Sequence, residues 1–324
     1  MRFLIAGLGS IGRRHLRNLL ALGQRDIVLY RTFQSTLPDD ELADFPTVTR
    51  LEDGLALKPD AVIVANPTAL HMEVAVPAAE AGCAVLLEKP IAHTLEAARS
   101  LQEAVRRTGA RVLVGFQFRF HPTLRRVKTW LTEGRIGRPL YFRAHWGEYL
   151  PDWHPWEDYR QSYAARADLG GGVIRTLSHP LDYARYLLGD GEVVWAFADH
   201  ISDLELQGVE DLGEIGLRFA NGAVGAVHVD YFQRPPAHWV EILGTEGTIA
   251  WNYYTGKAVW KPARGQGEEV ALPEGWERNH MFLEEMRHFL DVVQGQAEPI
   301  CTLEDGLENM RWVEEALRLA KRKS

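Results

Sequence analysis

The 324-residue sequence is poor in cysteine, has no surplus of positive charge and contains no long apolar segment. Its two cysteines, Cys83 and Cys301, lie far apart and outside any C-x-x-C pattern, which argues against a disulfide framework and a thiolate zinc site. The twelve histidines are scattered and H-E-x-x-H is absent, so we expect no metal. A net charge of −8 argues against nucleic acid or an acidic membrane surface as the main partner. Since an apolar run of the ~18 residues that a membrane span needs is absent, and so is a signal-peptide pattern, we expect a cytoplasmic protein.

The most informative stretch lies near the N-terminus, where an apolar run leads directly into the pattern G-x-G-x-x-G at Gly7, Gly9 and Gly12. Leucines at helical spacing follow, so the stretch predicts a strand, a tight turn and the start of a helix. In this geometry Gly7 makes the turn, Gly9 lets the backbone approach a pyrophosphate, and Gly12 lets the helix pack on the strand. Because a helix N-terminus attracts phosphate, the loop predicts a bound dinucleotide in contact with Ser10 and Ile11.

The residue after the second predicted strand, 26–30, bears on which dinucleotide is bound. Where an acidic side chain would hold the adenosine ribose of NAD, the chain has Arg31, followed by Thr32, Gln34 and Ser35. A cation at this place suits the 2′-phosphate of NADP, so we expect NADP in preference to NAD. An arginine can also stack on adenine or simply be solvated, and both readings stay open.

Strands and helices alternate regularly through residue 120. Apolar runs at 61–65, 84–87 and 112–116 are typical of parallel strands buried on both faces, and helices lie between them. This pattern predicts a doubly wound Rossmann domain over residues 1–120.

The pattern changes after Phe120. Helices are expected from His121 to Gly134 and from Gly172 to Leu188, a strand over 140–146, mostly strands over 193–272, and helices over 280–293 and 303–321. We therefore predict a second, α+β domain over 121–324 with a large, mostly antiparallel sheet and helices on one face. The helix over 303–321 is free to pack back on the first domain.

Several motifs occur in the order and spacing of a known family. Beyond the glycine loop they are Asn66-Pro67 with His71, Glu88-Lys89-Pro90, Val114-Gly115-Phe116-Gln117-Phe118-Arg119-Phe120, Gly170-Gly171-Gly172 and His179. Together they resemble the glucose-fructose oxidoreductase and inositol dehydrogenase family, Gfo/Idh/MocA. The resemblance implies a Rossmann domain, a C-terminal domain whose open-faced sheet forms a homodimer or homotetramer, and hydride exchange between a nicotinamide and a sugar or cyclitol hydroxyl. The resemblance also implies which residues contact the cofactor. Besides the glycine loop and Arg31-Thr32, these are Asn66, Pro67, His71, Glu88, Lys89 and Gln117.

Lys89 is the first candidate catalytic residue. It ends a buried strand at the sheet edge where ligands bind, and the resemblance implies a cis Lys89-Pro90 peptide that aims the ammonium at the substrate oxygen. Oxidation of an alcohol needs a group that takes or stabilises the hydroxyl proton, and a partly desolvated lysine can do either. The alternative is an exposed loop lysine paired with Glu88.

His179 is the second candidate. In the family an Asp precedes this His by three or four residues, whereas this chain has Thr176 and Arg175, so His179 lacks the usual carboxylate partner. Arg175 lies one helical turn away and could favour an anionic substrate, or it could pair with Asp182 or lie on the surface. Pro180 should kink this helix or mark its true start.

An irregular, aromatic-rich segment over 146–163 is the candidate substrate loop. Aromatic faces stack on sugars, and charged side chains such as Arg160, Asp152 and His154 can bind hydroxyls or phosphates. A lid or a dimer contact is the alternative. The substrate-binding residues predicted here and from the resemblance are Arg119, Tyr149, Trp153, Tyr159, Arg160, Arg175, Thr176 and His179.

These patterns predict an NADP- or NAD-dependent oxidoreductase that acts on a secondary alcohol of a polyol, sugar or sugar derivative. Two other classes stay open. One is a glycoside-cleaving enzyme that uses the nicotinamide transiently, because some members of the family do so. The other is a non-catalytic NADP(H)-binding sensor, which the missing Asp beside His179 suggests.

Overall fold

The computed structural model describes residues 1–33, 38–153, 155 and 157–321, and it divides into two compact units. The first unit comprises Met1–Gln117 and Arg278–Met310, and the second comprises Phe118–Glu277 with Arg311–Ser324. The predicted contacts of Gln34, Ser35 and His154 lie outside the described residues. Within those ranges, no helix is both long and apolar enough to cross a membrane.

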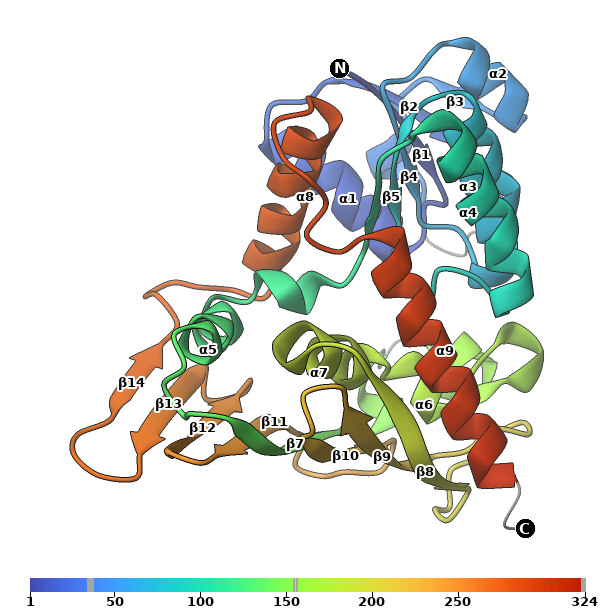
Figure 1. Cartoon of the computed structure of the whole chain (residues 1–324). Coiled ribbons are helices and arrows are strands. Elements are labelled where there is room, and N and C mark those ends of the chain that lie inside the picture. The colour runs from blue at the N-terminus through green and yellow to red at the C-terminus, as the bar shows by residue number, and fades with distance from the viewer. Residues whose placement is uncertain (34–37, 154, 156, 322–324) are drawn as a thin grey trace. The chain divides into compact units, whose positions relative to one another are not determined.

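The parallel sheet predicted from the alternating pattern is present: the first unit is built on six strands in the order β3-β2-β1-β4-β5-β6 (Figure 1). The strands are β1 Arg2–Ala6, β2 Asp26–Tyr30, β3 Thr47–Val48, β4 Ala61–Val64, β5 Ala84–Leu87 and β6 Val112–Val114. All residues of β4 and β5 are buried, which explains their continuous apolar sequences.

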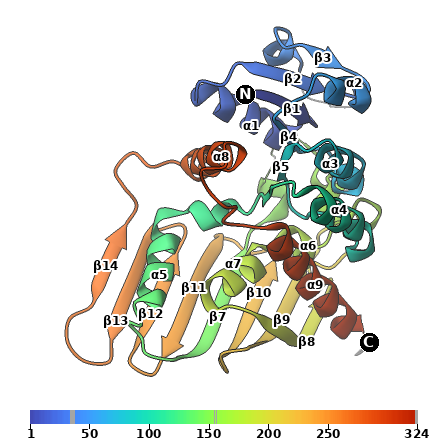
Figure 2. The same cartoon turned by 45° about the horizontal axis from the view of Figure 1, so that its top comes forward.

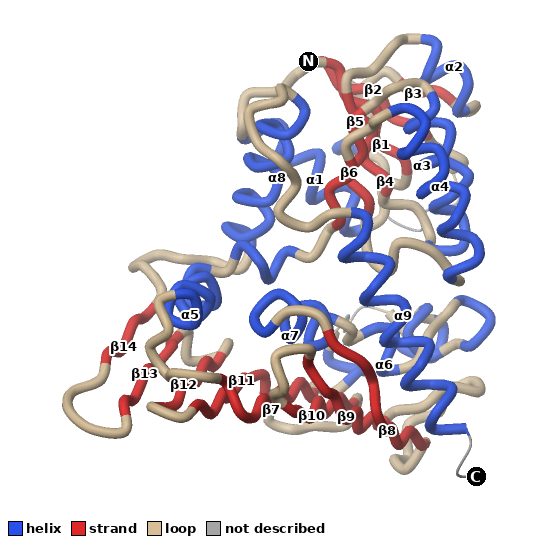
Figure 3. Tube along the Cα trace, in the orientation of Figure 1, coloured by secondary structure: helices blue, strands red, loops and turns tan. Residues whose placement is uncertain are grey.

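Helices cover both faces of this sheet, with α1 and α8 on one side and α3 and α4 on the other (Figure 3). The helices of this unit are α1 Ser10–Ala21, α2 Leu51–Ala56, α3 His71–Glu80, α4 Leu95–Thr108 and α8 Asn279–Val293, with 3₁₀ turns at Asp40–Leu42 and Thr68–Leu70. The apolar face of α8 packs against the first sheet although the helix is remote in sequence, so this unit takes in residues beyond a single cut near 120.

The second unit is built on an eight-stranded sheet in the order β14-β13-β12-β11-β7-β10-β9-β8. Only β7 and β10 pair in parallel, so the sheet is mostly antiparallel, as expected. The strands are β7 Pro139–Gly147, β8 Gly191–Asp199, β9 Leu212–Phe219, β10 Val224–Asp230, β11 Ala237–Gly244, β12 Gly247–Asn252, β13 Lys257–Pro262 and β14 Glu268–Ala271.

Helices α5 Pro122–Thr132 and α7 His179–Leu188 lie on one face of this sheet (Figure 2). The remaining helical pieces are α6 Val173–Thr176, α9 Leu303–Ala320, which begins in the first unit, and 3₁₀ turns at Gln117–Phe120, Leu150–Asp152, Tyr159–Gln161, Tyr163–Ala165 and Ala167–Leu169. Among the described residues no helix covers the opposite face, where Trp195 and Phe197 of β8 are 43% and 45% exposed. We call this the open face.

The helix expected over 172–188 is two helices. At Leu177 the backbone leaves helical geometry (φ −95°, ψ 42°), and α7 begins anew at His179 with Pro180 in its first turn. Because proline lacks an N–H, it fits best in the first turn of a helix, and Pro180 lies at the true beginning of α7.

Candidate functional site

The glycine loop between β1 and α1 has the shape that a pyrophosphate needs. Gly7 has φ +91°, and a Cβ there would lie 2.3 Å from the Asn66 amide nitrogen, while a Cβ on Gly12 would lie 1.9 Å from the Gly7 carbonyl oxygen. A Cβ on Gly9 would meet no atom within 4 Å. Packing therefore requires Gly7 and Gly12, whereas Gly9 leaves open space directly before α1, where Ser10 and Ile11 begin the helix.

The turn after β4 is held from behind by His71. Its Nε2 lies 2.9 Å from the Asn66 carbonyl oxygen and its Nδ1 lies 3.3 Å from that of Ile91, and the ring is buried. Burial lowers the pKa of His71 although both carbonyls oppose this. The structure thus places His71 as a link between two loops, without an exposed ring for the predicted cofactor contact. Asn66, next to Pro67, has a buried Oδ1 with no hydrogen-bond partner in the described ranges.

Arg31 is neither solvated nor alone. Its Nη2 lies 2.5 Å from Asp39 Oδ1, its guanidinium stacks over the Phe33 ring at 4.6 Å, and it is 9% exposed. The solvated alternative is therefore wrong, because Asp39 neutralises this cation. Thr32 beside it is exposed.

Glu88 and Lys89 follow β5 at the carboxyl edge of the sheet, and the Lys89-Pro90 peptide is cis, as the resemblance implies. Glu88 Oε1 lies 2.7 Å from His15 Nε2, and Oε2 accepts a hydrogen bond from the Lys89 amide at 3.3 Å. Glu88 is buried, so its side chain supports the loop from within the unit. Burial lowers the pKa of Lys89, Glu88 opposes this and Arg278 adds to it. A lowered pKa suits a lysine that exchanges protons.

Glu285 on α8 is a buried acid that the sequence patterns did not single out. Both carboxylate oxygens are buried without a hydrogen-bond partner in the part of the chain that the structure describes. Burial and then the charge of Glu88 raise the pKa of Glu285 well above its ordinary value. Its position four residues after Met281 and four before Phe289, on the apolar face of the helix, is the signal that could have revealed it.

In the second unit His179 is the first residue of α7 and is 2% exposed. Its ring stands edge-on to Phe118 at 5.0 Å and is tilted against Trp146 at 5.6 Å. Thr176, one of the residues in place of the usual Asp, is buried at the end of α6.

Two arginines predicted to contact substrate have carboxylates nearby in the second unit. Arg119 is buried and donates to Asp182 through Nε at 3.1 Å and Nη2 at 2.7 Å, so Asp182 is paired with Arg119 and not with Arg175. Arg175 instead interacts electrostatically with Glu210, whose Oε1 accepts a hydrogen bond from the Ile174 amide at 3.1 Å. The burial of Arg119 makes it a poor substrate contact, and its pairing ties the 3₁₀ turn Gln117–Phe120 to α7.

The aromatic segment divides into two groups. Tyr149 lies under the Arg234 guanidinium at 4.0 Å, and Trp153 packs edge-on against Tyr231 at 5.6 Å. Further along, Tyr159 and Arg160 both contact Glu205: the Tyr159 hydroxyl accepts from its amide at 3.1 Å and the Arg160 Nη1 donates to its carboxylate at 3.3 Å.

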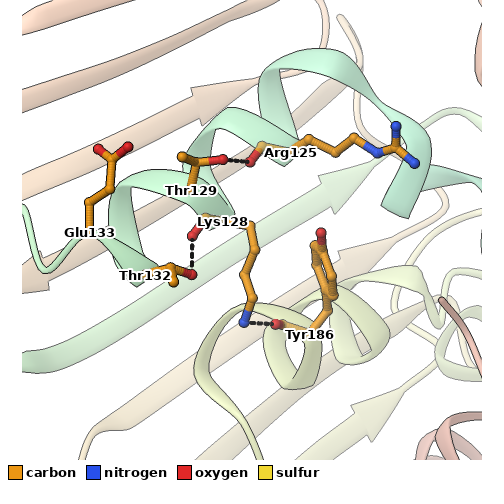
Figure 4. A pocket seen from close by; sticks show the side chains of 6 residues that line it. All are labelled: Arg125, Lys128, Thr129, Thr132, Glu133 and Tyr186. Atoms are coloured by element: carbon orange, nitrogen blue, oxygen red, sulfur yellow. Dashed lines mark hydrogen bonds between the residues drawn. The ribbon is translucent and has the colours of Figure 1, made fainter.

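A shallow depression of about 410 Å³ lies between α5 and α7 of the second unit (Figure 4). It is lined by Arg125, Lys128, Thr129, Thr132, Glu133 and Tyr186. Lys128 Nζ is held by the Tyr186 carbonyl oxygen at 2.6 Å, and none of the predicted site residues lines this depression.

A dinucleotide cradle on a parallel sheet, followed by a unit with a large open-faced sheet, defines a class of nucleotide-dependent oxidoreductases. The chain belongs to the Gfo/Idh/MocA family: residues 1–116 match the model described as "Oxidoreductase family, NAD-binding Rossmann fold" and residues 124–250 match "GFO/IDH/MocA C-terminal domain". The expected family is thereby confirmed, and the protein is an NAD(P)-dependent oxidoreductase.

Curated relatives include enzymes of cyclitols and anhydrosugars. The chain is 32% identical to 1,5-anhydro-D-fructose reductase of Ensifer adhaerens over 252 residues, covering 76% of this chain and 73% of that protein. It is 28% identical to scyllo-inositol 2-dehydrogenase (NAD(+)) of Bacillus subtilis over 328 residues, covering 96% and 91%. It is 34% identical to levoglucosan dehydrogenase of Pseudarthrobacter phenanthrenivorans, but over 59% of this chain and only 55% of that protein. A solved levoglucosan dehydrogenase in complex with NADH and levoglucosan has the same fold, with a TM-score of 0.89 at 23% identity over 100% of this chain and 98% of that one.

Proposed function

We propose that this protein transfers hydride between NAD(P) and a secondary alcohol or ketone of a sugar, cyclitol or sugar derivative. The proposal rests mainly on two features of the first unit. The glycine loop leaves space for a pyrophosphate, and Lys89, whose pKa is lowered, lies at the carboxyl edge of the same sheet. The names of the relatives, which act on inositols and anhydrosugars, support this substrate class.

The proposed chemistry assigns the proton to Lys89 and His179. The nicotinamide, when bound, supplies the hydride acceptor. Lys89 takes the hydroxyl proton as the C–H bond breaks, and burial, which lowers its pKa, makes its neutral amine more accessible than that of a solvated lysine. His179 of the second unit, which is preceded by Thr176 and Arg175 where the family has Asp, is the second acid–base group that we assign.

A panel of sugars, cyclitols and their ketones, followed by absorbance of the reduced cofactor, tests the proposal. We expect turnover of at least one polyol or sugar with net cofactor reduction. Product formation without net reduction identifies the glycoside-cleaving alternative. Tight cofactor binding with no turnover across the panel favours the sensor.

Replacement of Lys89 or His179 by Ala tests the assigned roles. Each change should lower kcat by about 10²–10⁴-fold, the usual contribution of a general acid–base group, and should change cofactor affinity far less. Lys261→Ala, an exposed lysine of β13, serves as the control and should keep full activity. Unchanged turnover in both site variants places the chemistry elsewhere.

We also propose a preference for NADP, with Arg31 turning from Asp39 to the 2′-phosphate. Asp39 is half exposed, so it can be hydrated when Arg31 exchanges partners. Arg31→Asp should weaken NADPH binding by about 1.5–3 kcal/mol, the range for a hydrogen bond to a charged group. Asp39→Asn should strengthen it, because a carboxylate beside the phosphate is removed. If calorimetry shows that the wild type binds NADH at least as tightly as NADPH, the preference is refuted.

Self-association through the open face is the last part of the proposal. The family's C-terminal domain and the exposed Trp195 and Phe197 support a homodimer or homotetramer in which a second copy covers this face.

A further inference from the structure

Strand register brings two histidines and two carboxylates together on the open face of the second unit. Cross-strand partners Glu214 of β9, His228 of β10 and His145 of β7 form one row. Asp230 lies two residues after His228 and therefore on the same face. Figure 2 shows these three strands side by side in the sheet.

The polar atoms of this group converge on one carboxylate oxygen. Asp230 Oδ2 lies 2.9 Å from His228 Nε2 and 4.0 Å from His145 Nε2. One ligand atom from each of the three residues lies within 4.8 Å of the others. Donor atoms bound tetrahedrally to one ion at about 2.0–2.2 Å lie ~3.3–3.6 Å apart, so the stacked His145 and His228 rings must rotate to bring their nitrogens together.

We propose that His145, His228 and Asp230 form a binding site for a divalent transition-metal ion of the zinc type. Two imidazole nitrogens and a carboxylate oxygen are a typical ligand set for this class of ion. A water molecule completes the coordination. In the single chain the histidine side chains are 20% and 23% exposed, whereas Asp230 is buried beneath them.

Neighbouring groups orient His228 and Asp230, whereas Gln233 Oε1, 3.3 Å from His145 Nε2, must give way to a bound ion. Glu214 Oε1 lies 2.6 Å from His228 Nδ1, so it accepts the Nδ1 proton and leaves Nε2 as the ligand atom, in the manner of a carboxylate–histidine–metal triad. The backbone amides of Phe232 and Gln233 donate to Asp230 Oδ1 at 2.9 and 2.6 Å, which turns Oδ2 toward the rings.

The surroundings of His145 and Asp230 add to this support. The His145 ring is stacked between His228 at 4.3 Å and Trp239 at 5.5 Å. A Cβ on Gly147 would lie 2.2 Å from Asp230 Oδ2, so glycine at this position of β7 leaves room for the carboxylate.

The competing occupant of this cluster is a proton. Burial lowers the pKa of His228, but hydrogen bonds and charges of Asp230 and Glu214 outweigh it and raise the pKa to about 9. A cationic His228 satisfies both carboxylates without any metal. The experiment must therefore separate a metal site from an ion-paired imidazolium.

Zn²⁺ titration of the chelator-treated, full-length protein by calorimetry makes this separation, with Co²⁺ absorbance as a second readout of direct coordination. We expect one ion per chain and visible Co²⁺ bands. His145→Ala, His228→Ala and Asp230→Asn should each weaken binding by more than ~100-fold and abolish the bands, and Glu214→Gln should weaken it by about 10- to 100-fold, as for other residues that orient a ligand. Asp230→Asn keeps Oδ1 for the backbone amides, which guards the fold.

His93→Ala, an exposed histidine of the first unit, is the matched control and should bind like the wild type. Circular dichroism checks the fold of each variant. If His228→Ala is unfolded, His145→Gln, which removes the imidazole but keeps a polar side chain, decides. Equal Zn²⁺ affinity in the wild type and in the His145 variants, or the absence of Co²⁺ bands in the wild type, overturns the proposal and leaves an imidazolium between two carboxylates.

Discussion

Among single residues, the three glycines of the first loop differ in what they do. Gly7 needs a positive φ and close contact with Asn66, and Gly12 needs close contact with Gly7. Gly9 has an extended backbone (φ −73°, ψ −167°) that any residue adopts, and open space where its side chain would be. Folding alone therefore does not require glycine at position 9, but ligand approach does.

This difference gives a direct test of cofactor binding. Gly9→Val should abolish binding of both NADH and NADPH in a calorimetric titration, because the side chain fills the space for the pyrophosphate. Its melting temperature should stay near that of the wild type. Gly7→Ala is the contrast: it should lower the melting temperature, since its Cβ would clash with backbone. Retained affinity in a folded Gly9→Val variant would refute the assigned cradle.

The sequence predicts which residue types form the candidate site, but it does not predict the ion-pair partners of these residues. The cis Lys89-Pro90 peptide follows from the family resemblance. The sequence predicts Arg31 and Arg119 as ligand contacts. In the structure Arg31 pairs with Asp39 and Arg119 with Asp182, and no local sequence pattern connects either pair. A motif therefore predicts where an arginine stands in the chain, but the carboxylate that pairs with it depends on the fold.

Among the elements, strands and helices of the first sheet follow from periodicity because buried parallel strands are continuously apolar. Periodicity alone does not predict the break between α6 and α7, but Pro180, which lacks an N–H, does indicate it. The packing of α8 on the first sheet was not predictable from the helix itself, since an apolar stripe does not specify which surface covers it. Glu285 stands in that stripe as an acid at an apolar position, and only the fold shows that it is buried near Glu88.

Glu285 should make the stability of the protein depend on pH. Its raised pKa means that the folded state holds a proton that the unfolded chain releases near pH ~4.3. The stability that protonated Glu285 contributes to the folded state is fully present below that pH. It is lost as pH rises through the folded pKa, by at most ~1.4 kcal/mol per pH unit. Glu285→Gln cannot ionise, so it should be more stable than the wild type at pH 8, with the difference vanishing toward acid pH.

Thermal unfolding of both proteins across this pH range measures the difference. Glu284→Gln, an exposed neighbour on α8, should unfold like the wild type at every pH. A constant difference between wild type and Glu285→Gln at all pH values would show that Glu285 does not carry a displaced pKa.

For the molecule as a whole, sequence alternation in the second half predicts a sheet with one buried and one accessible face. On β7, Phe142, Ala144 and Trp146 are buried toward the helices, and the alternate residues face the other way. What covers the accessible face is not encoded in this alternation. The exposed Trp195 and Phe197 are the physical reason to expect a partner, because burial of aromatic side chains away from water lowers the free energy.

Trp195→Glu tests whether a second copy is that partner. Trp195 lies on the open face over Gly216, where a Cβ would come within 1.9 Å of the indole nitrogen, so the indole extends across β9. A carboxylate buried between two copies without a counter-charge costs several kcal/mol, so the variant should shift a homodimer or homotetramer to smaller species in sedimentation velocity. Leu57→Glu, a comparably exposed apolar residue of the first unit, should leave the mass unchanged. A wild type that sediments as a monomer, or a Trp195→Glu variant with the same mass as an oligomeric wild type, would show that this face does not form the subunit contact.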